Sequence, residues 1–211
     1  MPLILKKEED RLSFAVWKVE ESLSFFQNKM DLSPAEKEET QNFSPARLLE
    51  WYAARYLLAL LHGQKQRVPL HKDKYGKPFF ADKNTNLSIS HSGDMVAAAL
   101  SPYHTGIDLQ IISEKVKSIK NKFLSPDELD FCDDDLLCLN KMWTIKEALY
   151  KAYGKKGLIF KENIKIPYFF RDKNGYIGNA VIDTKADKKN YMIFGYELDN
   201  AIMSIATELE E

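Results

Sequence analysis

The feature that most constrains the fold of this chain is a helix start that occurs twice. The segments Leu32–Glu36 (LSPAE) and Leu124–Glu128 (LSPDE) lie 92 residues apart in a chain of 211. In each, a serine cap is followed by proline in the first turn and by glutamate three residues after the cap, which is typical of a helix N-terminus. The same offset places Trp143 on Trp51. We therefore predict a duplicated α+β unit, although repeated use of a common helix start would give the same pattern.

The order of the other predicted elements also repeats. Helices are expected from Ser44 to Gly63 and from Met142 to Gly154, each ended by its glycine. We predict an α+β fold of two pseudo-repeated halves, 1–103 and 104–211, each with helices and a small antiparallel sheet, packed about a pseudo-twofold axis. The predicted strands cover 12–19, 87–90, 96–100, 107–111, 176–183, 192–197 and 202–207, with a turn at 91–94.

Composition limits the classes of partner. The chain has 30 basic and 31 acidic residues, so no global charge draws it to nucleic acid or to an anionic membrane. The two cysteines, Cys132 and Cys138, and the four histidines lack metal-ligand spacing, so we expect reduced thiols and no structural zinc. The apolar run at the N-terminus is too short for a signal peptide, and the other apolar runs are too short to span a bilayer. We expect a soluble, cytoplasmic protein.

Two segments carry residues suited to metal and phosphate chemistry. In Gly106–Gln110 a strand would present Asp108 and Gln110 on one face. In the helix after Met142, Glu147 and Lys151 lie four residues apart on one stripe, with Lys146 on the next. Mg²⁺ is commonly held by one or two carboxylates, with water and substrate phosphate completing the shell. A solvated strand-end carboxylate and an ordinary helix-face ion pair are the structural alternatives.

Further candidates lie in the first half. Ser90 and His91 precede Gly93, where hydroxyls, imidazole and turn amides could hold a phosphate. Lys77 projects from a Tyr-Gly-Lys-Pro turn at the end of a basic stretch that includes Lys65 and Arg67. Arg55 lies within an apolar helix, where a permanent cation needs an anionic partner. Ordinary surface positions would explain His91 and Lys77 equally well.

The order of these motifs resembles that of the Sfp-type 4′-phosphopantetheinyl transferases, of the holo-carrier-protein synthase superfamily. The resemblance rests on Gly76–Pro78, Ser90–Gly93, Gly106–Gln110 and Trp143–Lys151. It implies an enzyme that moves the phosphopantetheine arm of coenzyme A to a serine of an acyl or peptidyl carrier protein. The by-product would be adenosine 3′,5′-bisphosphate. It further implies a coenzyme A-binding first half and a metal-binding, catalytic second half.

The resemblance also implies roles for single residues. Asp108 and Glu147 would hold Mg²⁺, with Gln110 at the third metal position, where many relatives carry an acid. Glu147 would act as the base or position it, and Lys151 would neutralise the pyrophosphate, with Lys146 nearby on coenzyme A. The remaining contacts to coenzyme A would come from Arg55, Lys77, Ser90 and His91.

Two other functions fit the same residues less well. A non-catalytic module that binds coenzyme A or carrier protein would not need Asp108, Glu147 and Lys151 together. A phosphohydrolase would need an arrangement that positions a water, and no motif here provides one.

The quaternary arrangement is expected from the repeat. Two fused halves can build a cleft as a monomer. The 92-residue offset sets Arg55 against Glu147 in the paired helices, and both would face that cleft. The carrier protein would dock on a basic run, for which a solvated helix face is the alternative. That run consists of Lys115, Lys117, Lys120 and Lys122.

Overall fold

Two helix starts and two glycine stops organise the chain into two compact units. The computed structural model describes residues 3–9, 11–63, 68–81, 84–172 and 175–209. By internal contacts it divides into unit 1, Met1–Pro102, and unit 2, Tyr103–Glu211. Lys65 and Arg67 of the basic stretch lie outside the described residues.

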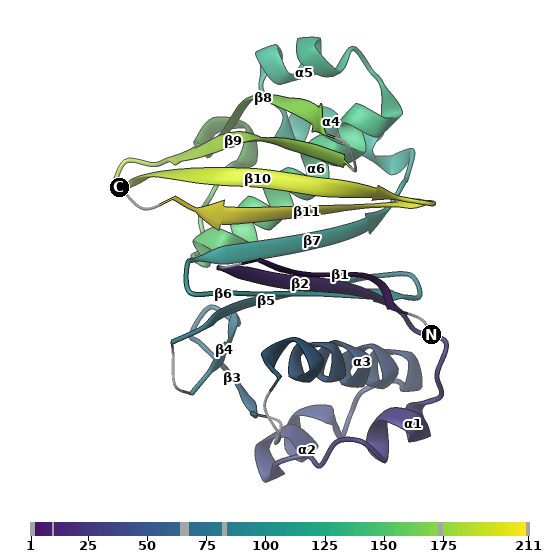
Figure 1. Ribbon diagram of the computed structural model, residues 1–211. Helices are drawn as coiled ribbons and strands as arrows, with labels where there is room; N and C mark the ends of the chain where they lie inside the picture. The colour runs from purple at the N-terminus through teal and green to yellow at the C-terminus, as the bar shows by residue number, and fades with distance from the viewer. Residues whose placement is uncertain (1–2, 10, 64–67, 82–83, 173–174, 210–211) are drawn as a thin grey trace. The chain divides into compact units, whose positions relative to one another are not determined.

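Unit 1 is built from one long helix packed on an antiparallel sheet (Figure 1). Trp17, Leu57 and Val96 lie in its core, because the apolar stripe of the long helix covers the sheet. The sheet has the order β1-β2-β6-β5 and a separate hairpin pairs β3 with β4. The elements are β1 (Leu3–Glu9), β2 (Leu12–Lys18), α1 (Leu23–Gln27), α2 (Pro34–Thr40), α3 (Pro45–His62), β3 (Leu70–Lys72), β4 (Pro78–Phe80), β5 (Asn86–Ser92) and β6 (Met95–Ser101).

Unit 2 follows the same plan with a larger sheet (Figure 1). Its order is β7-β11-β10-β9-β8, and α6 packs on β7 and β11. Met142, Ile145 and Ile202 are completely buried in its core. The elements are β7 (Thr105–Ile111), α4 (Lys115–Phe123), α5 (Pro126–Cys132), α6 (Leu136–Tyr153), α7 (Phe160–Asn163), β8 (Ile164–Asp172), β9 (Gly175–Asp183), β10 (Lys188–Leu198) and β11 (Ala201–Glu208).

The two predicted helix caps are present and make the same hydrogen bonds. The backbone N–H of Ser33 donates to Glu36 Oε2 at 3.0 Å, and that of Ser125 donates to Glu128 Oε2 at 2.9 Å. Each serine hydroxyl in turn accepts the N–H of its glutamate, which completes a capping box. Seven-residue helices therefore start at equivalent points of the two units.

The sheets support the repeat. In unit 1, β2 pairs with β6, the second strand of the β5–β6 hairpin. In unit 2, β7 pairs with β11, the second strand of the β10–β11 hairpin. In both units the helices come between the first strand and the hairpin. The α+β prediction is confirmed, while the packing about a pseudo-twofold axis stays a prediction.

The register of the long helices differs from the expected offset by one residue. Both α3 and α6 have 18 residues and end at a left-handed glycine, Gly63 or Gly154. These ends are 91 residues apart, because the connection between α5 and α6 is one residue shorter than that between α2 and α3. Arg55 is therefore equivalent to Lys146, and the predicted match of Arg55 to Glu147 is wrong.

The turn after β5 is shorter than predicted. His91 and Ser92 belong to the strand, and only Gly93 and Asp94 form the turn. The reason is the pairing of β5 with β6, which continues through Ser92 and Met95. Ser90 and Ser92 consequently lie on one face of the strand and His91 on the other.

The prediction of two reduced thiols is also wrong, because Cys132 and Cys138 form a disulfide. Asp133 and Asp134 adopt positive φ angles directly after α5. This tight reversal leaves the two cysteine Cα atoms 5.4 Å apart, within the range that a disulfide spans. The bond links the end of α5 to the first turn of α6.

No helix in the described part of the chain is both long enough and apolar enough to cross a bilayer.

Candidate active site

Asp108 of β7 faces the long helix of unit 2. It is only 7% exposed, and its register partner in β11 is Ser204. A carboxylate at such a position is costly unless it is paired. Its Oδ1 accepts a hydrogen bond from Lys151 Nζ of α6 at 2.7 Å, and the same ammonium donates to the Ile107 carbonyl at 3.0 Å. An ion pair therefore joins the strand to the helix.

Gly106 explains how strand and helix come so close. A Cβ atom added at this glycine would lie 1.9 Å from the Ala148 carbonyl oxygen and 2.5 Å from the Ala152 nitrogen, both in α6. Because these obstacles are backbone atoms, they cannot move aside as a flexible side chain would. Glycine two residues before Asp108 thus fixes the carboxylate next to α6.

Glu147 lies one helical turn before Lys151 and completes a cluster of three ionisable groups. Burial raises its pKa to about 6, the negative charge of Asp108 adds to this effect, and the Lys151 ammonium opposes it. The two carboxyl groups are therefore close enough to interact electrostatically. Two carboxylates that share one site favour binding of a cation.

A buried hydroxyl network lies behind Asp108. Tyr176 Oη and Ser204 Oγ are 2.5 Å apart, and Ser204 Oγ is also 2.5 Å from Thr144 Oγ1 of α6. When the Ser204 hydroxyl donates to Thr144 Oγ1, the Thr144 hydroxyl can donate in turn to the Lys141 carbonyl. Burial raises the pKa of Tyr176, so the phenol stays protonated and keeps its donor. The network holds β9, β11 and α6 together at the strand pair that carries Asp108.

Gln110 lies two residues after Asp108 on the same face of β7. Its Nε2 donates to the Ile111 carbonyl at 3.2 Å, which leaves the amide oxygen as an acceptor. Among the described residues no group of three or more His, Cys, Asp or Glu forms a metal-sized cluster. Two carboxylates and an amide oxygen nevertheless fit Mg²⁺, which keeps several waters and takes few protein oxygens. The Lys151 ammonium on Asp108 marks where a cation is stable.

The structure places Lys146 away from these groups, which corrects its predicted contact with coenzyme A. The side chain is completely buried, and Nζ donates to Glu128 Oε2 at 2.6 Å and to the Ile164 carbonyl at 3.1 Å. Burial lowers the pKa of Lys146, and the Glu128 charge opposes that shift. The reason for the error is helix geometry, since Lys146 lies on the stripe of α6 that faces α5 and β8.

Unit 1 holds a pocket of about 200 Å³ between α2, α3, β5 and the β3–β4 hairpin. Arg55 lies in its wall, with its guanidinium carbon 3.6 Å from the centre of the Trp51 ring and Nη2 at 3.7 Å from Glu39 Oε2. The predicted need of Arg55 for an anionic partner is met by Glu39. The pocket is lined by Glu39, Phe43, Arg47, Glu50, Trp51, Ala54, Arg55, Lys72, Pro78, Ile89 and His91.

The other predicted residues of unit 1 lie around or near this pocket. His91 is in the pocket wall, and its Nδ1 is 3.5 Å from Glu50 Oε2. Ser90 is buried and points to the opposite face of β5, so the two do not form the predicted turn cradle. Lys77 follows the tight turn at Gly76, where its N–H donates to Asp73 Oδ1 at 2.9 Å. It is next to the pocket residue Pro78.

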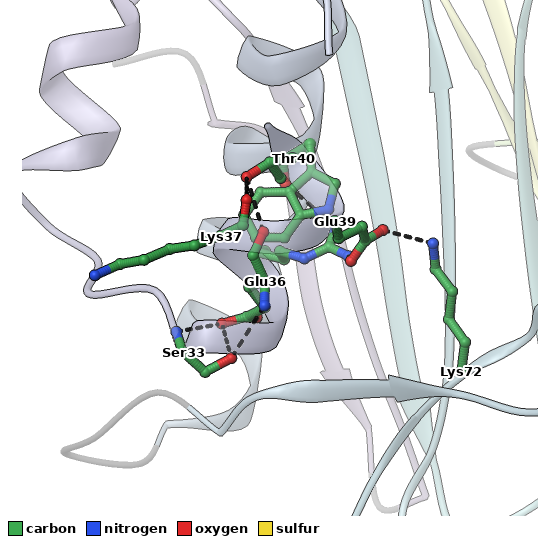
Figure 2. A network of polar contacts seen from close by, with 8 residues as sticks. Ser33, Glu36, Lys37, Glu39, Thr40 and Lys72 are labelled. Atoms are coloured by element: carbon green, nitrogen blue, oxygen red, sulfur yellow. Dashed lines mark hydrogen bonds and ion pairs between the residues drawn. The ribbon is translucent and has the colours of Figure 1, made fainter. Parts of the chain in front are cut away.

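Sequence reasoning missed Glu39 and Glu50. Glu50 carried a signal, because Arg47, Trp51 and Arg55 recur at four-residue spacing on α3 and Glu50 lies beside that stripe. Glu39 carried none, since its partner Lys72 is 33 residues away on a separate hairpin. The pairing in Figure 2 depends on the tertiary fold alone.

Comparison with known proteins shows similarity over the segment that contains these residues. The sequence model of the 4′-phosphopantetheinyl transferase superfamily matches residues 104–197, which include Asp108, Gln110, Glu147 and Lys151. The resemblance found in the sequence motifs is thereby confirmed.

Two curated relatives carry the same description. The 4′-phosphopantetheinyl transferase gsp of Aneurinibacillus migulanus is 34% identical over 125 residues, covering 57% of this chain and 50% of the relative. The 4′-phosphopantetheinyl transferase ffp of Bacillus subtilis is 30% identical over 101 residues, covering 43% of each. The chain thus spans about half the length of the curated relatives it matches.

Proposed function

We propose that the chain transfers the 4′-phosphopantetheine group of coenzyme A to a serine of an acyl or peptidyl carrier protein. One observation carries the proposal. The Asp108–Lys151 ion pair lies beside Glu147 within the segment that matches the transferase superfamily. Phosphoryl transfer depends mainly on positioning and on charge stabilisation, and this cluster supplies two carboxylates and a cation at one point.

Asp108 and Glu147 would hold Mg²⁺, with Gln110 at a third position. The bound ion would stabilise negative charge on the pyrophosphate oxygens of coenzyme A. The Gln110 amide oxygen is neutral and a weaker metal ligand than a carboxylate. Whether it binds Mg²⁺ directly or through a water, it would contribute less to metal affinity than Asp108 or Glu147. The magnesium requirement is part of the proposal.

The reacting groups follow from the protein side chains. The carrier serine Oγ would attack the phosphorus that bears pantetheine. Its proton would pass to Glu147 or to a water that Glu147 orients. The bond from that phosphorus to the bridging oxygen would break, and adenosine 3′,5′-bisphosphate would leave with the electron pair. Lys151 would neutralise the charge on the leaving phosphate.

Unit 1 would bind the nucleotide end of coenzyme A. Arg55 and His91 line one pocket, and Lys77 directly precedes Pro78, another residue of that pocket. Ser90 would act from its buried position in β5. We therefore assign coenzyme A binding to residues 1–103 and metal binding and catalysis to 104–211. Lys146 has no part in this assignment.

The carrier protein would dock on the lysines of α4. Lys117 pairs with Glu114 and Lys120 pairs with Asp134. Lys115 and Lys122 are exposed, so they would provide most of the attraction to an acidic carrier domain. We propose that the protein acts as a monomer in the cytoplasm.

A mass-shift assay tests the proposal. An apo carrier protein, coenzyme A and Mg²⁺ are mixed with the chain, and the carrier should gain the mass of one phosphopantetheine. A panel of carriers from fatty acid, polyketide and nonribosomal peptide synthesis would identify the substrate. Binding of coenzyme A without a mass shift on any carrier would indicate a binding module instead. Release of nucleotide without a carrier would indicate a phosphohydrolase.

A further inference from the structure

Two cations of the unit 1 pocket, Lys72 and Arg55, are paired with one carboxylate of the same pocket. Glu39 Oε1 is 2.5 Å from Lys72 Nζ, and Glu39 Oε2 is 3.7 Å from Arg55 Nη2. We propose that Glu39 is an internal counter-ion that competes with the anionic ligand for Lys72 and Arg55 and so limits its affinity. The identity of the ligand as the phosphates of coenzyme A rests on the proposed function.

The backbone at Glu39 is held by the capped helix α2, while Lys72 lies on the short hairpin β3–β4. Figure 2 shows the capping contacts of Ser33 and Glu36 at the start of α2, and Thr40 Oγ1 donates to the Glu36 carbonyl at 2.8 Å. Lys72 reaches Glu39 from the hairpin β3–β4, with half of its side chain exposed. A phosphate that enters the pocket can therefore draw Lys72 away from Glu39. The Glu39 carboxylate remains near the phosphate and repels it.

The ion pair made by the equivalent cation of unit 2 shows the contrast. Lys146 and Glu128 lie 2.6 Å apart with side-chain exposures of 0% and 6%. Arg55 and Glu39 lie 3.7 Å apart with exposures of 9% and 26%, and both line the pocket. The first pair is a permanent part of a core. The second is longer than a hydrogen bond and is open to solvent, so a ligand can replace it.

Arg55 does not depend on Glu39 for its position. Its guanidinium lies over the Trp51 ring, and Nη1 donates to the Trp51 carbonyl at 3.4 Å. Removing the Glu39 charge should therefore leave the cation in the pocket wall. The sign of the expected effect follows, because the ligand would no longer compete with Glu39 for Lys72 and Arg55 and would lose a repelling carboxylate.

The test compares Glu39→Gln with Glu38→Gln. Glu38 is the exposed neighbour on α2, so its variant has the same net charge without the pocket contact. Binding of coenzyme A and of inorganic pyrophosphate is measured by calorimetry without Mg²⁺ or carrier. We expect Glu39→Gln to bind both about five-fold more tightly than wild type at low salt, and Glu38→Gln to stay within about two-fold. The gain should shrink at high salt.

The opposite results would overturn the inference. They are equal or weaker binding by Glu39→Gln, an equal gain in Glu38→Gln, or no binding of either probe by any of the three chains. Glu39→Asp keeps the charge and should retain wild-type affinity, which separates charge from packing. Thermal unfolding of each variant checks that it is folded.

The proposed function is judged separately by carrier modification with the wild-type chain. If that fails while Glu39→Gln still binds pyrophosphate more tightly, the counter-ion stands and the function does not. If modification succeeds while Glu39→Gln binds no more tightly than wild type, the function stands and the counter-ion does not.

Discussion

Arg55 and Lys146 occupy the same position in two helices. Each lies eleven residues after the N-cap of its helix, Ser44 for α3 and Asp135 for α6. Each is buried and pairs with a carboxylate of the preceding capped helix. The two units thus share the placement of a cation, but only in unit 1 does that cation line a pocket.

The Lys146 pair should matter for stability. Glu128 accepts hydrogen bonds from Ser125, Lys146 and Ile166, so Lys146→Met would leave a buried carboxylate without its charge partner. We expect a loss of about 3–5 kcal/mol in the free energy of unfolding, measured in urea. Adding Glu128→Leu should recover part of it. A loss below about 1 kcal/mol for the single variant would contradict a buried ion pair.

Alanine substitutions at the candidate active site should fall in a fixed order. Asp108→Ala and Glu147→Ala should lower the rate of carrier modification by about 10³-fold or more, and Lys151→Ala by about 10²-fold. Gln110→Ala should cost less than about ten-fold, because a neutral amide contributes least to the metal. Asp127→Ala, an exposed acid of α5, is the control. If Gln110→Ala were as damaging as Asp108→Ala, the assignment of metal ligands would be wrong.

The raised pKa of Glu147 predicts how the stability of the metal-free chain depends on pH. The folded chain has a pKa of about 6 at Glu147 against an ordinary value of 4.5, so folding favours the protonated carboxyl. The stability that the chain has when Glu147 is protonated is fully present below about pH 4.5. It is lost as the pH rises through about 6, where Glu147 ionises in the folded chain. Wild type should lose on the order of 1–2 kcal/mol relative to Glu147→Gln across this range. Urea unfolding of both chains without metal measures the difference, and a constant difference would contradict the shift.

The disulfide should add modestly to stability. Cys132 and Cys138 are six residues apart, so the bond closes a short loop and restricts the unfolded chain little. Replacing both by serine should cost about 2 kcal/mol in the free energy of unfolding. The same loss should appear in wild type after reduction, and the serine variant should not respond to reductant. A response of that variant would point to an effect of the reductant elsewhere.

Salt should weaken binding of the carrier protein if α4 is its docking surface. Lys115→Glu with Lys122→Glu should slow carrier modification through a higher KM for the carrier, with coenzyme A affinity unchanged. Lys185→Glu with Lys188→Glu, in the β9–β10 connection and at the start of β10, changes the net charge equally and serves as the control. A KM that does not depend on salt would exclude the α4 lysines.

Local signals in the sequence predicted much of the fold. Ser33, Ser125, Gly63 and Gly154 each mark a helix end through contacts with residues a few positions away. The edge strand β8 was missed because its sequence, IKIPYFFRD, carries a proline and no clear alternation.

The candidate site was predictable only where residues act within one element. The spacing of Glu147 and Lys151 is a property of one helix, and Asp108 follows from strand alternation. The direction of Lys146 depends on how α6 lies against α5, and the Glu39–Lys72 pair depends on where a hairpin lies. Neither is encoded in local spacing.

The strand order also sets when the site can form during folding. Asp108 of β7 pairs with Ser204, and in unit 1 Ser13 of β2 pairs with Leu100, so each of these strands pairs with a strand more than eighty residues later in the sequence. Closing such long loops slows folding. A chain that ends at β10 contains Asp108, Glu147 and Lys151 but lacks the strand that pairs with β7. The ladder that carries Asp108 is therefore complete only when β11 is present to pair with β7.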